Sequence, residues 1–155
     1  MNLTWHVRAF DQLSPGELYA IMALRQRVFV VEQRCAYLDA DGVDQISQHL
    51  WADRAGAVAA YVRIVPAGER FAEISIGRVV TAPEARGTGL GRELMRRGIA
   101  ACGDVAIRIG AQAHLEKFYA ELGFARASDL YDEDGIPHIE MVRPAGLGTP
   151  TPRTT

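Results

Sequence analysis

Apolar and polar residues alternate along this chain with two different periods, which predict strands and helices in turn. A period of two at residues 5–10 predicts a half-buried strand. At Ser14 the pattern changes to a capping box, because Glu17 follows three residues later and Pro15 occupies the first helical position. The helix predicted from there runs toward the apolar segment 28–33, which we expect to be buried or to line a pocket.

The same reasoning extends to the rest of the chain and predicts an α/β domain. Strands are expected at residues 48–53, 57–65, 71–81, 105–109, 124–127 and 137–142, helices at 90–102 and 115–122, and a turn at 131–135. This order predicts a mixed, mostly antiparallel sheet of about seven strands flanked by helices. Residues 1–144 would form a single domain, and residues 145–155 read by composition as a disordered tail.

Composition excludes several classes of protein. The chain has 155 residues, 48% of them hydrophobic, which suits one domain with a sizeable core. The formal net charge of −2 offers no basic excess for nucleic acid. Cys35 and Cys102 stand in no metal-like or CxxC spacing, so we expect both to stay reduced. With no signal-like or membrane-length apolar run, the sequence predicts a soluble, cytoplasmic protein.

An acidic loop at residues 35–44 raises the question of calcium. A calcium loop of the EF-hand type needs acids at its first, third and fifth positions and a glutamate at its twelfth. Here Gly42 comes fourth and Leu50 twelfth. We therefore expect a polar turn and no metal, and its place after the apolar helix end leaves open a role in shaping an acceptor pocket.

A glycine-rich segment between a predicted strand and a predicted helix carries the candidate chemistry. Gly87, Gly89 and Gly91 alternate with other residues, and Arg86 and Arg92 flank them. Glycine lets the backbone approach a ligand closely or take positive φ, and the free N–H groups at a helix start attract anions. The segment therefore predicts a binding site for a pyrophosphate group at residues 86–92, which we call the cradle.

Three known phosphate-binding loops can be compared with this segment. A P-loop fails because Arg92 and Glu93, not Lys and Ser or Thr, follow the last glycine. A dinucleotide fingerprint fails because its third glycine would come three residues after the second, and here it comes two after. The pattern Arg/Gln-x-x-Gly-x-Gly/Ala fits residues 86–91 throughout. This segment resembles the acetyl-CoA loop of the GNAT N-acetyltransferase superfamily, and the predicted order of elements agrees with the GNAT fold.

A second stretch strengthens the resemblance. GNAT proteins carry a later motif, Asn-x-x-Ala-x-x-x-Tyr-x-x-x-Gly-Phe, and residues 112–124 match it at Tyr119, Gly123 and Phe124, with Gln112 in place of Asn. The motif's Ala is not matched, since Leu115 stands where Ala is common. Flanking segments, among them 28–33, 76–79, 110–115 and 133–138, resemble the ElaA-like branch of the superfamily.

The resemblance implies acetyl transfer from acetyl-CoA to an amine, without a metal. The pantetheine arm would lie along the strand before the glycine loop, and an amide near Val79 would polarise the thioester carbonyl. Tyr119 would protonate the leaving thiolate. The residues implied in cofactor binding are Val79, Val80, Thr81, Arg86, Gly87, Thr88, Gly89, Leu90, Gly91, Arg92, Gln112 and Tyr119.

The residue that deprotonates the acceptor ammonium stays open at this point. Glu73 lies thirteen residues before Arg86, a spacing similar to that of the catalytic glutamate in histone-acetylating GNAT proteins. His138 heads the last strand and is a second candidate for base and for acceptor binding, because histidine is the residue type most often used as a base at neutral pH. Glu32 would bind a cationic acceptor, or act as a third base. A bound water chain is a further alternative.

Two other functions share the same loop. An acyl-CoA sensor would keep the cradle and lack turnover, and a nucleotide-binding protein would prefer ATP to acetyl-CoA. A covalent route through Cys35 or Cys102 lacks a neighbouring base motif, so direct transfer is preferred. The acceptor is either a small molecule or a protein amine, and an unpaired strand edge would permit a homodimer.

Overall fold

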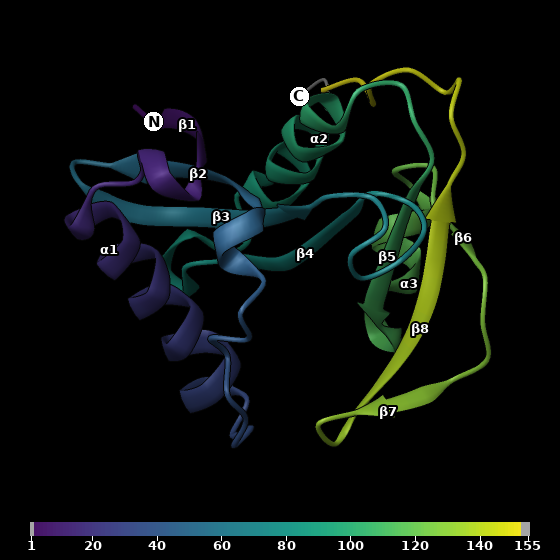
Figure 1. Ribbon diagram of the computed structural model, residues 1–155, viewed down its shortest axis with the longest axis horizontal. Coiled ribbons are helices and arrows are strands. Elements are labelled where there is room, and N and C mark those ends of the chain that lie inside the picture. The colour runs from purple at the N-terminus through teal and green to yellow at the C-terminus, as the bar shows by residue number, and fades with distance from the viewer. Residues whose placement is uncertain (1, 153–155) are drawn as a thin grey trace.

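The computed structural model describes residues 2–152, and they form two sheets with helices packed around the first (Figure 1). Four antiparallel strands in the order β1-β2-β3-β4 make the first sheet. The second contains β5, β8 and β6 in that order, with β7 also paired to β8. The strands are β1 Thr4–Ala9, β2 Gln48–Arg54, β3 Ala57–Val65, β4 Ser75–Thr81, β5 Ile107–Gln112, β6 Ala125–Arg126, β7 Tyr131–Glu133 and β8 Ile136–Arg143.

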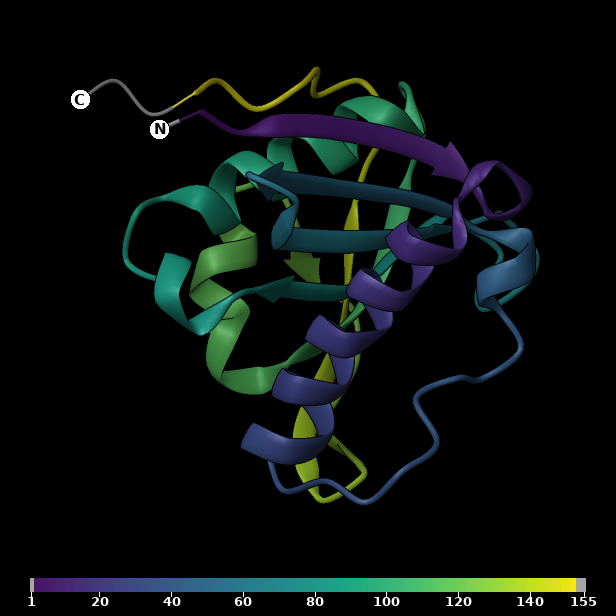
Figure 2. The same ribbon diagram turned by 90° about the vertical axis from the view of Figure 1, so that its left-hand side faces the viewer.

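The helices cover both faces of the first sheet, and the burial of β3 shows this directly. From Ala59 to Val65 every residue of β3 is buried, as expected for a strand covered on both sides. The guanidinium of Arg25 on α1 (Pro15–Arg25) lies over the Tyr61 ring, whereas Gly98 of α2 (Leu90–Cys102) lies against Val62. Because Tyr61 and Val62 point to opposite faces, α1 and α2 sandwich the sheet (Figure 2).

The predicted fold class is confirmed, with corrections to single elements. The structure has eight strands instead of about seven, because the expected turn at 131–135 begins with the short strand β7. Strand β4 begins at Ser75 and not at residue 71, β5 extends to Gln112, and α3 covers only Glu116–Ala120. The apolar segment after α1 is π-helical over Gln26–Glu32 and buries Val28, as expected of a buried or pocket-lining run.

The segment after β8, for which composition predicts a disordered tail from residue 145, is held against the protein at its start. The Gly146 amide donates to the Asp104 carboxylate at 2.6 Å, and Arg143 donates to the carbonyl of Gly148. Residues 153–155 of that tail lie outside the described part of the chain. No helix among residues 2–152 is long and apolar enough to cross a bilayer.

Candidate active site

The two sheets join at one point and then separate. Ile74 and Ile107 form a parallel bridge, and the Arg108 amide donates to the Ile74 carbonyl at 3.0 Å. Beyond this bridge β4 and β5 diverge, as Figure 1 shows, and a cleft of about 860 Å³ lies between them. Six of the residues predicted to bind the cofactor line it: Val79, Val80, Thr81, Arg86, Gln112 and Tyr119.

Strand β4 carries a bulge where it borders the cleft. Its register against β3 shifts from Gly77 opposite Arg63 to Val80 opposite Tyr61, so Arg78 and Val79 together face a single residue of β3. Arg78 has φ 52°, a left-handed conformation that costs a residue with a side chain ~1–3 kcal/mol and persists only where surrounding contacts fix it. Bulges of this kind redirect the backbone beside binding sites.

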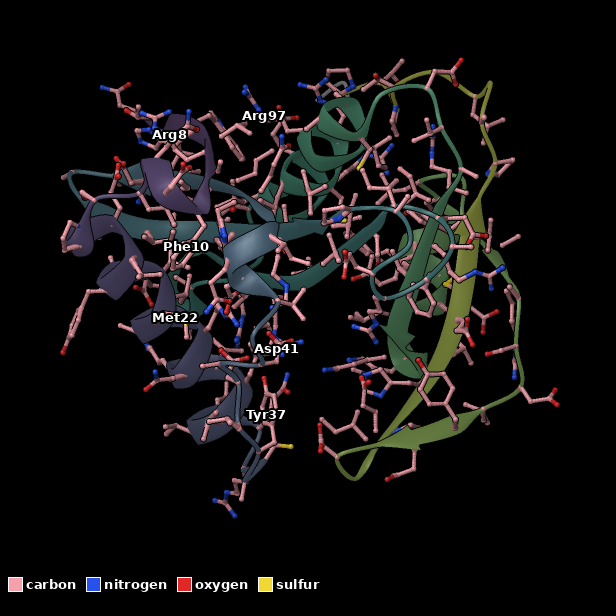
Figure 3. The ribbon with its side chains drawn as sticks, in the orientation of Figure 1. Arg8, Phe10, Met22, Tyr37, Asp41 and Arg97 are labelled. Atoms are coloured by element: carbon pink, nitrogen blue, oxygen red, sulfur yellow. The ribbon has the colours of Figure 1, made fainter. Side chains whose placement is uncertain are left out.

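A buried ionic cluster supplies those contacts. Arg78 donates through Nε to Asp39 at 2.8 Å and through Nη2 to Asp41 at 3.2 Å, and it lies over the Tyr37 ring. Figure 3 shows Tyr37 and Asp41 on the loop that borders the gap between the two halves of the protein. The full cluster contains Arg25, Arg63 and Arg78 with Asp39, Asp41 and Asp44. The predicted polar turn is therefore pinned to α1, β3 and β4.

The glycine loop borders a second cavity, of about 290 Å³, lined by Arg86, Gly87, Gly89, Leu90, Gly91 and Arg92. Gly87 and Gly89 have φ of 76° and 81°, and a Cβ at either would meet no atom within 4 Å. Thr88 shapes the turn by donating its hydroxyl to the Ala85 carbonyl at 2.7 Å.

The donors of this loop fit a pyrophosphate group. Among the described residues, the buried Nε of Arg92 has no hydrogen-bond partner, and the amides of residues 87–89 donate to no protein carbonyl. The first N–H groups of α2 add to them, because a helix start leaves its amides unpaired. Such a set of unpaired donors at a helix N-terminus is what an anionic phosphate requires.

Tyr119 lies on the wall of the cleft at the end of α3. Only 5% of the residue is exposed, and it packs edge-on against Phe118 and Phe124. Burial raises the pKa of its phenol above the usual value, so the hydroxyl keeps its proton at neutral pH. No described side chain or carbonyl hydrogen-bonds to this hydroxyl, which leaves it available to a bound group.

His138 borders the same cleft from β8, where it faces Gln112 in the register with β5. Its Nδ1 lies 2.7 Å from the Ile136 carbonyl, which fixes the proton of the neutral ring on Nδ1 and leaves a lone pair on Nε2. That Nε2 lies 3.2 Å from a carboxylate oxygen of Glu133. Glu133 also contacts Arg70 at 3.4 Å, so a carboxylate held by a cation faces the ring.

Glu73, predicted as a candidate base, lies away from this arrangement. It precedes Ile74, where the two sheets are still joined, and is not one of the residues that line the cleft. Its carboxylate accepts from Arg108 Nε at 3.1 Å, and this hydrogen bond lowers the pKa of Glu73. Because Arg108 also binds Glu140, the glutamate belongs to a closed ion-pair set.

Glu32 lies where the two cavities meet. Its carboxylate is 2.6 Å from Nη2 of Arg86, which, like Thr81, lines both the cleft and the cavity of the glycine loop. The pair joins the end of the π-helical segment to the glycine loop, and both side chains are more than 40% exposed. Glu32 thus borders the cleft as predicted, and in the structure its partner is a cradle arginine.

The comparison with known proteins agrees with this geometry. The family model of the acetyltransferase (GNAT) domain matches residues 22–144. This chain belongs to the GNAT acetyltransferase family. ElaA of Escherichia coli is 38% identical over 147 residues, which span 91% of this chain and 96% of ElaA. The predicted resemblance to GNAT proteins and to ElaA is confirmed.

Solved structures of GNAT proteins superimpose closely on this one. The crystal structure of ElaA gives a TM-score of 0.86 over 92% of this chain and 99% of that one. An acyl-CoA N-acyltransferase from Pseudomonas aeruginosa gives 0.88 at 41% identity, with the same coverage. An aminoglycoside 6′-N-acetyltransferase in complex with coenzyme A, only 16% identical, shares the fold with a TM-score of 0.65 over 97% of this chain and 99% of that one. The chain is thus an acyltransferase of the GNAT family.

Two further histidines and the two cysteines of this GNAT protein divide between the buried interior and the border of the cleft. His49 is fully buried, with Nδ1 2.6 Å from the Tyr61 hydroxyl and Nε2 2.9 Å from the Asp44 carbonyl. His114 borders the cleft. Both cysteines are free thiols, and burial raises the pKa of Cys102 to about 12, which makes it a poor nucleophile. Cys35 borders the cleft and donates to the Asp134 carbonyl at 3.3 Å.

The ionic cluster of the GNAT domain predicts a specific loss of stability in acid. Burial alone would raise the pKa of Asp41, but hydrogen bonds from Arg63 and the Val43 amide outweigh it and hold the pKa well below its usual value. A lowered carboxyl pKa contributes stability that is complete above the unfolded value of ~3.9 and is lost as pH falls below it. We expect urea unfolding of Asp41→Asn to show a pH slope below pH ~4 that is shallower than wild type by up to ~1.4 kcal/mol per pH unit. Asp129→Asn, which removes an exposed carboxylate, is the control, and equal slopes for Asp41→Asn and wild type would contradict the prediction.

Proposed function

We propose that this GNAT protein transfers the acetyl group of acetyl-CoA directly to an amine. One observation carries the proposal: a cleft lined by the protonated phenol of Tyr119 and by an imidazole whose Nε2 faces a carboxylate adjoins the cavity of the glycine loop, with which it shares Thr81 and Arg86. Acetyl-CoA supplies an activated thioester carbonyl. The donors of the loop and Arg92 would hold its pyrophosphate, and the backbone of residues 79–81 would pair with the amides of its pantetheine arm.

The chain's own groups account for each proton. His138 Nε2 would take a proton from the acceptor ammonium, and the Glu133 carboxylate would stabilise the resulting imidazolium. The freed amine nitrogen forms the bond to the acetyl carbon as the carbon–sulfur bond breaks. The Val79 amide would donate to the carbonyl oxygen while charge develops on it. Tyr119 would give its proton to the leaving thiolate, which needs a phenol that is protonated at neutral pH. The phenolate would then take the second proton from the acetylated nitrogen, which yields the neutral amide and restores the phenol.

The chemistry of the cleft lining favours a cationic acceptor. Five acidic residues line the cleft, and three of them pair with its four arginines: Asp41 with Arg63 and Arg78, Glu133 with Arg70, and Glu32 with Arg86. The other two, Glu69 and Asp134, are in no ion pair with these arginines. An ammonium group would find charge-assisted hydrogen bonds there. Both a small amine and a protein amine satisfy this chemistry. The homodimer and the cytoplasmic location stay predictions.

Binding of acetyl-CoA is the first test of this proposal. A ligand bound only by the folded state raises the unfolding midpoint, by ~2.7 kcal/mol of stability at a hundredfold excess over its dissociation constant. We expect thermal unfolding to shift upward with acetyl-CoA and with CoA, and to be unchanged by ATP or NAD at equal concentration. A shift with ATP that displaces acetyl-CoA would point to a nucleotide-binding protein instead.

The Glu32–Arg86 ion pair predicts that a substitution at Glu32 strengthens the binding of CoA, whereas most substitutions in a binding site weaken it. Because Glu32 competes with the pyrophosphate for Arg86, removing its charge frees the guanidinium. Exposed pairs are worth ~0.2–1 kcal/mol, so Glu32→Gln should bind CoA up to ~5-fold more tightly by isothermal titration. Glu116→Gln, which removes the exposed partner of Arg126 and lines neither cavity, is the control and should leave the affinity unchanged. Weaker binding by Glu32→Gln would contradict this account of the pair.

A further inference from the structure

The direction of the Val79 amide follows from the register of β4 on β3. The Ala82 amide donates to the Ala59 carbonyl at 2.8 Å, so the amide of Ala82 faces β3. Amides two residues apart on a strand point the same way, and those of the residues between point the opposite way. The Val80 amide therefore faces β3, whereas those of Val79 and Thr81 face the cleft. Val79 is the second residue of the bulge and directly follows Arg78, so its orientation depends on the conformation of Arg78.

Arg78 is held by contacts from one loop. Asp39 accepts from Arg78 with its carboxylate at 2.8 Å and with its carbonyl at 3.3 Å, and Asp41 accepts at 3.2 Å. Tyr37 completes the surroundings, since its ring lies 5.7 Å from the guanidinium carbon and its hydroxyl donates to Asp39 at 2.6 Å. The loop thus fixes a left-handed residue that would otherwise relax toward ordinary strand geometry.

The loop itself is anchored to the rigid part of the domain. Arg25 is fully buried and bridges Asp39 at 2.8 Å to Asp44 at 2.6 Å, which ties the loop to α1. Arg63 bridges Asp41 at 2.8 Å to Asp44 at 3.0 Å, which ties it to β3 beside the bulge. Each of the three aspartates therefore pairs with two arginines. Movement of the bulge would break several of these ion pairs together.

We propose that Arg78, clamped by Asp39 and Asp41, is a positioning residue that aims the Val79 amide at the acyl carbonyl of the bound thioester. This inference rests on the proposed function, because it assigns a role to a group beside the thioester. The clamp acts on carbonyl recognition and not on the pyrophosphate, which binds at the glycine loop. Loss of the clamp should therefore change how acetyl-CoA is held at its acyl end and leave the affinity for CoA nearly unchanged.

The test uses acetyl-CoA labelled with ¹³C at the acetyl carbonyl, together with the variants Arg78→Gly and Asp39→Asn. A hydrogen bond to the carbonyl oxygen moves the ¹³C resonance downfield. We expect the bound signal of the wild-type protein to lie downfield of free acetyl-CoA, and that of Arg78→Gly to return toward the free value. Glycine adopts positive φ without strain, so Arg78→Gly should fold. It loses only the contacts that the Arg78 side chain makes with Asp39, Asp41 and Tyr37. CoA affinity by titration should stay within about twofold, which also reports that the variant is folded.

A matched control comes from the chain itself. Arg34 is an exposed arginine with φ 51°, and Arg34→Gly makes the same substitution at nearly the same backbone angle outside the clamp. This control should keep the wild-type ¹³C shift. A wild-type shift in both Arg78→Gly and Asp39→Asn would overturn the clamp and leave the proposed function standing. Failure of the wild-type protein to bind acetyl-CoA would overturn both.

Discussion

Replacement of Tyr119 by phenylalanine should lower kcat for acetyl transfer by ~10²–10⁴-fold, the usual contribution of a positioned general acid. The substitution removes one oxygen from a buried ring that packs on Phe118 and Phe124, so the shape of the wall is kept. Because the hydroxyl has no protein partner among the described residues, its loss leaves no buried group unpaired. The substitution should therefore slow the departure of the thiolate and leave the stability of the fold unchanged.

The measurement is release of free thiol from acetyl-CoA in the presence of the best amine found in a panel, with CoA affinity measured in parallel. The dissociation constant for CoA should change less than about threefold, because a reacting-group effect appears in kcat and not in ground-state binding. Tyr19→Phe removes a hydroxyl from a tyrosine that is 79% exposed on α1 and should behave as wild type. Full activity of Tyr119→Phe would show that water, or another group, protonates the thiolate.

Gly89→Glu should weaken binding of CoA and acetyl-CoA by ~100-fold or more. Gly89 is the residue before α2 and has φ 81°, where an L-residue is strained. A carboxylate there would also oppose the pyrophosphate at the helix start, where anions are otherwise stabilised by ~0.3–2 kcal/mol and each charge-assisted hydrogen bond adds ~1.5–3 kcal/mol. Isothermal titration with CoA measures the change.

The other end of the same helix provides the control for this variant. Gly103 follows α2 and has φ 79°, and as at Gly89 a Cβ added there would meet no atom within 4 Å. Gly103→Glu therefore introduces the same charge away from the cradle, and at φ 79° and ψ −172° it is more strained than Gly89→Glu at φ 81° and ψ 3°. It should bind CoA as wild type does after allowance for any loss of stability. Equal weakening of CoA binding in both variants would indicate a general effect of strain. Unchanged CoA binding in Gly89→Glu would contradict the assignment of the glycine loop as the pyrophosphate site.

The parts of the site that can be predicted from the sequence are those fixed by local backbone chemistry. The glycine loop between Arg86 and Arg92 is recognisable because its residue types are those that a tight turn before a helix requires. Tyr119 is recognisable through a motif in one short helix. Strand β7 is not, because three residues beside an Asp-Gly turn carry too little alternation to distinguish a strand from the turn itself.

The ionic cluster escapes sequence reasoning because its members are far apart along the chain. Asp39 and Arg78 lie 39 residues apart, and Asp44 and Arg63 lie 19 apart, so no local pattern joins them. One signal is present: Arg63 stands inside an otherwise apolar strand, and a buried arginine needs acidic partners. The surroundings of Glu73 escape for the same reason, because spacing along the chain does not reveal that Arg108 on β5 binds its carboxylate where the two sheets join.

Catalysed transfer to an amine tests the central claim most directly. The protein would be incubated with acetyl-CoA and a panel of primary amines that includes small diamines, lysine and short peptides with free amino termini. The account predicts release of free CoA that depends on both protein and amine, with the acetylated amine detected by mass spectrometry and the reaction strongly reduced in Tyr119→Phe. Saturable binding of acetyl-CoA without acetylation of any amine in the panel would contradict the account and favour a sensor that binds acyl-CoA without turnover.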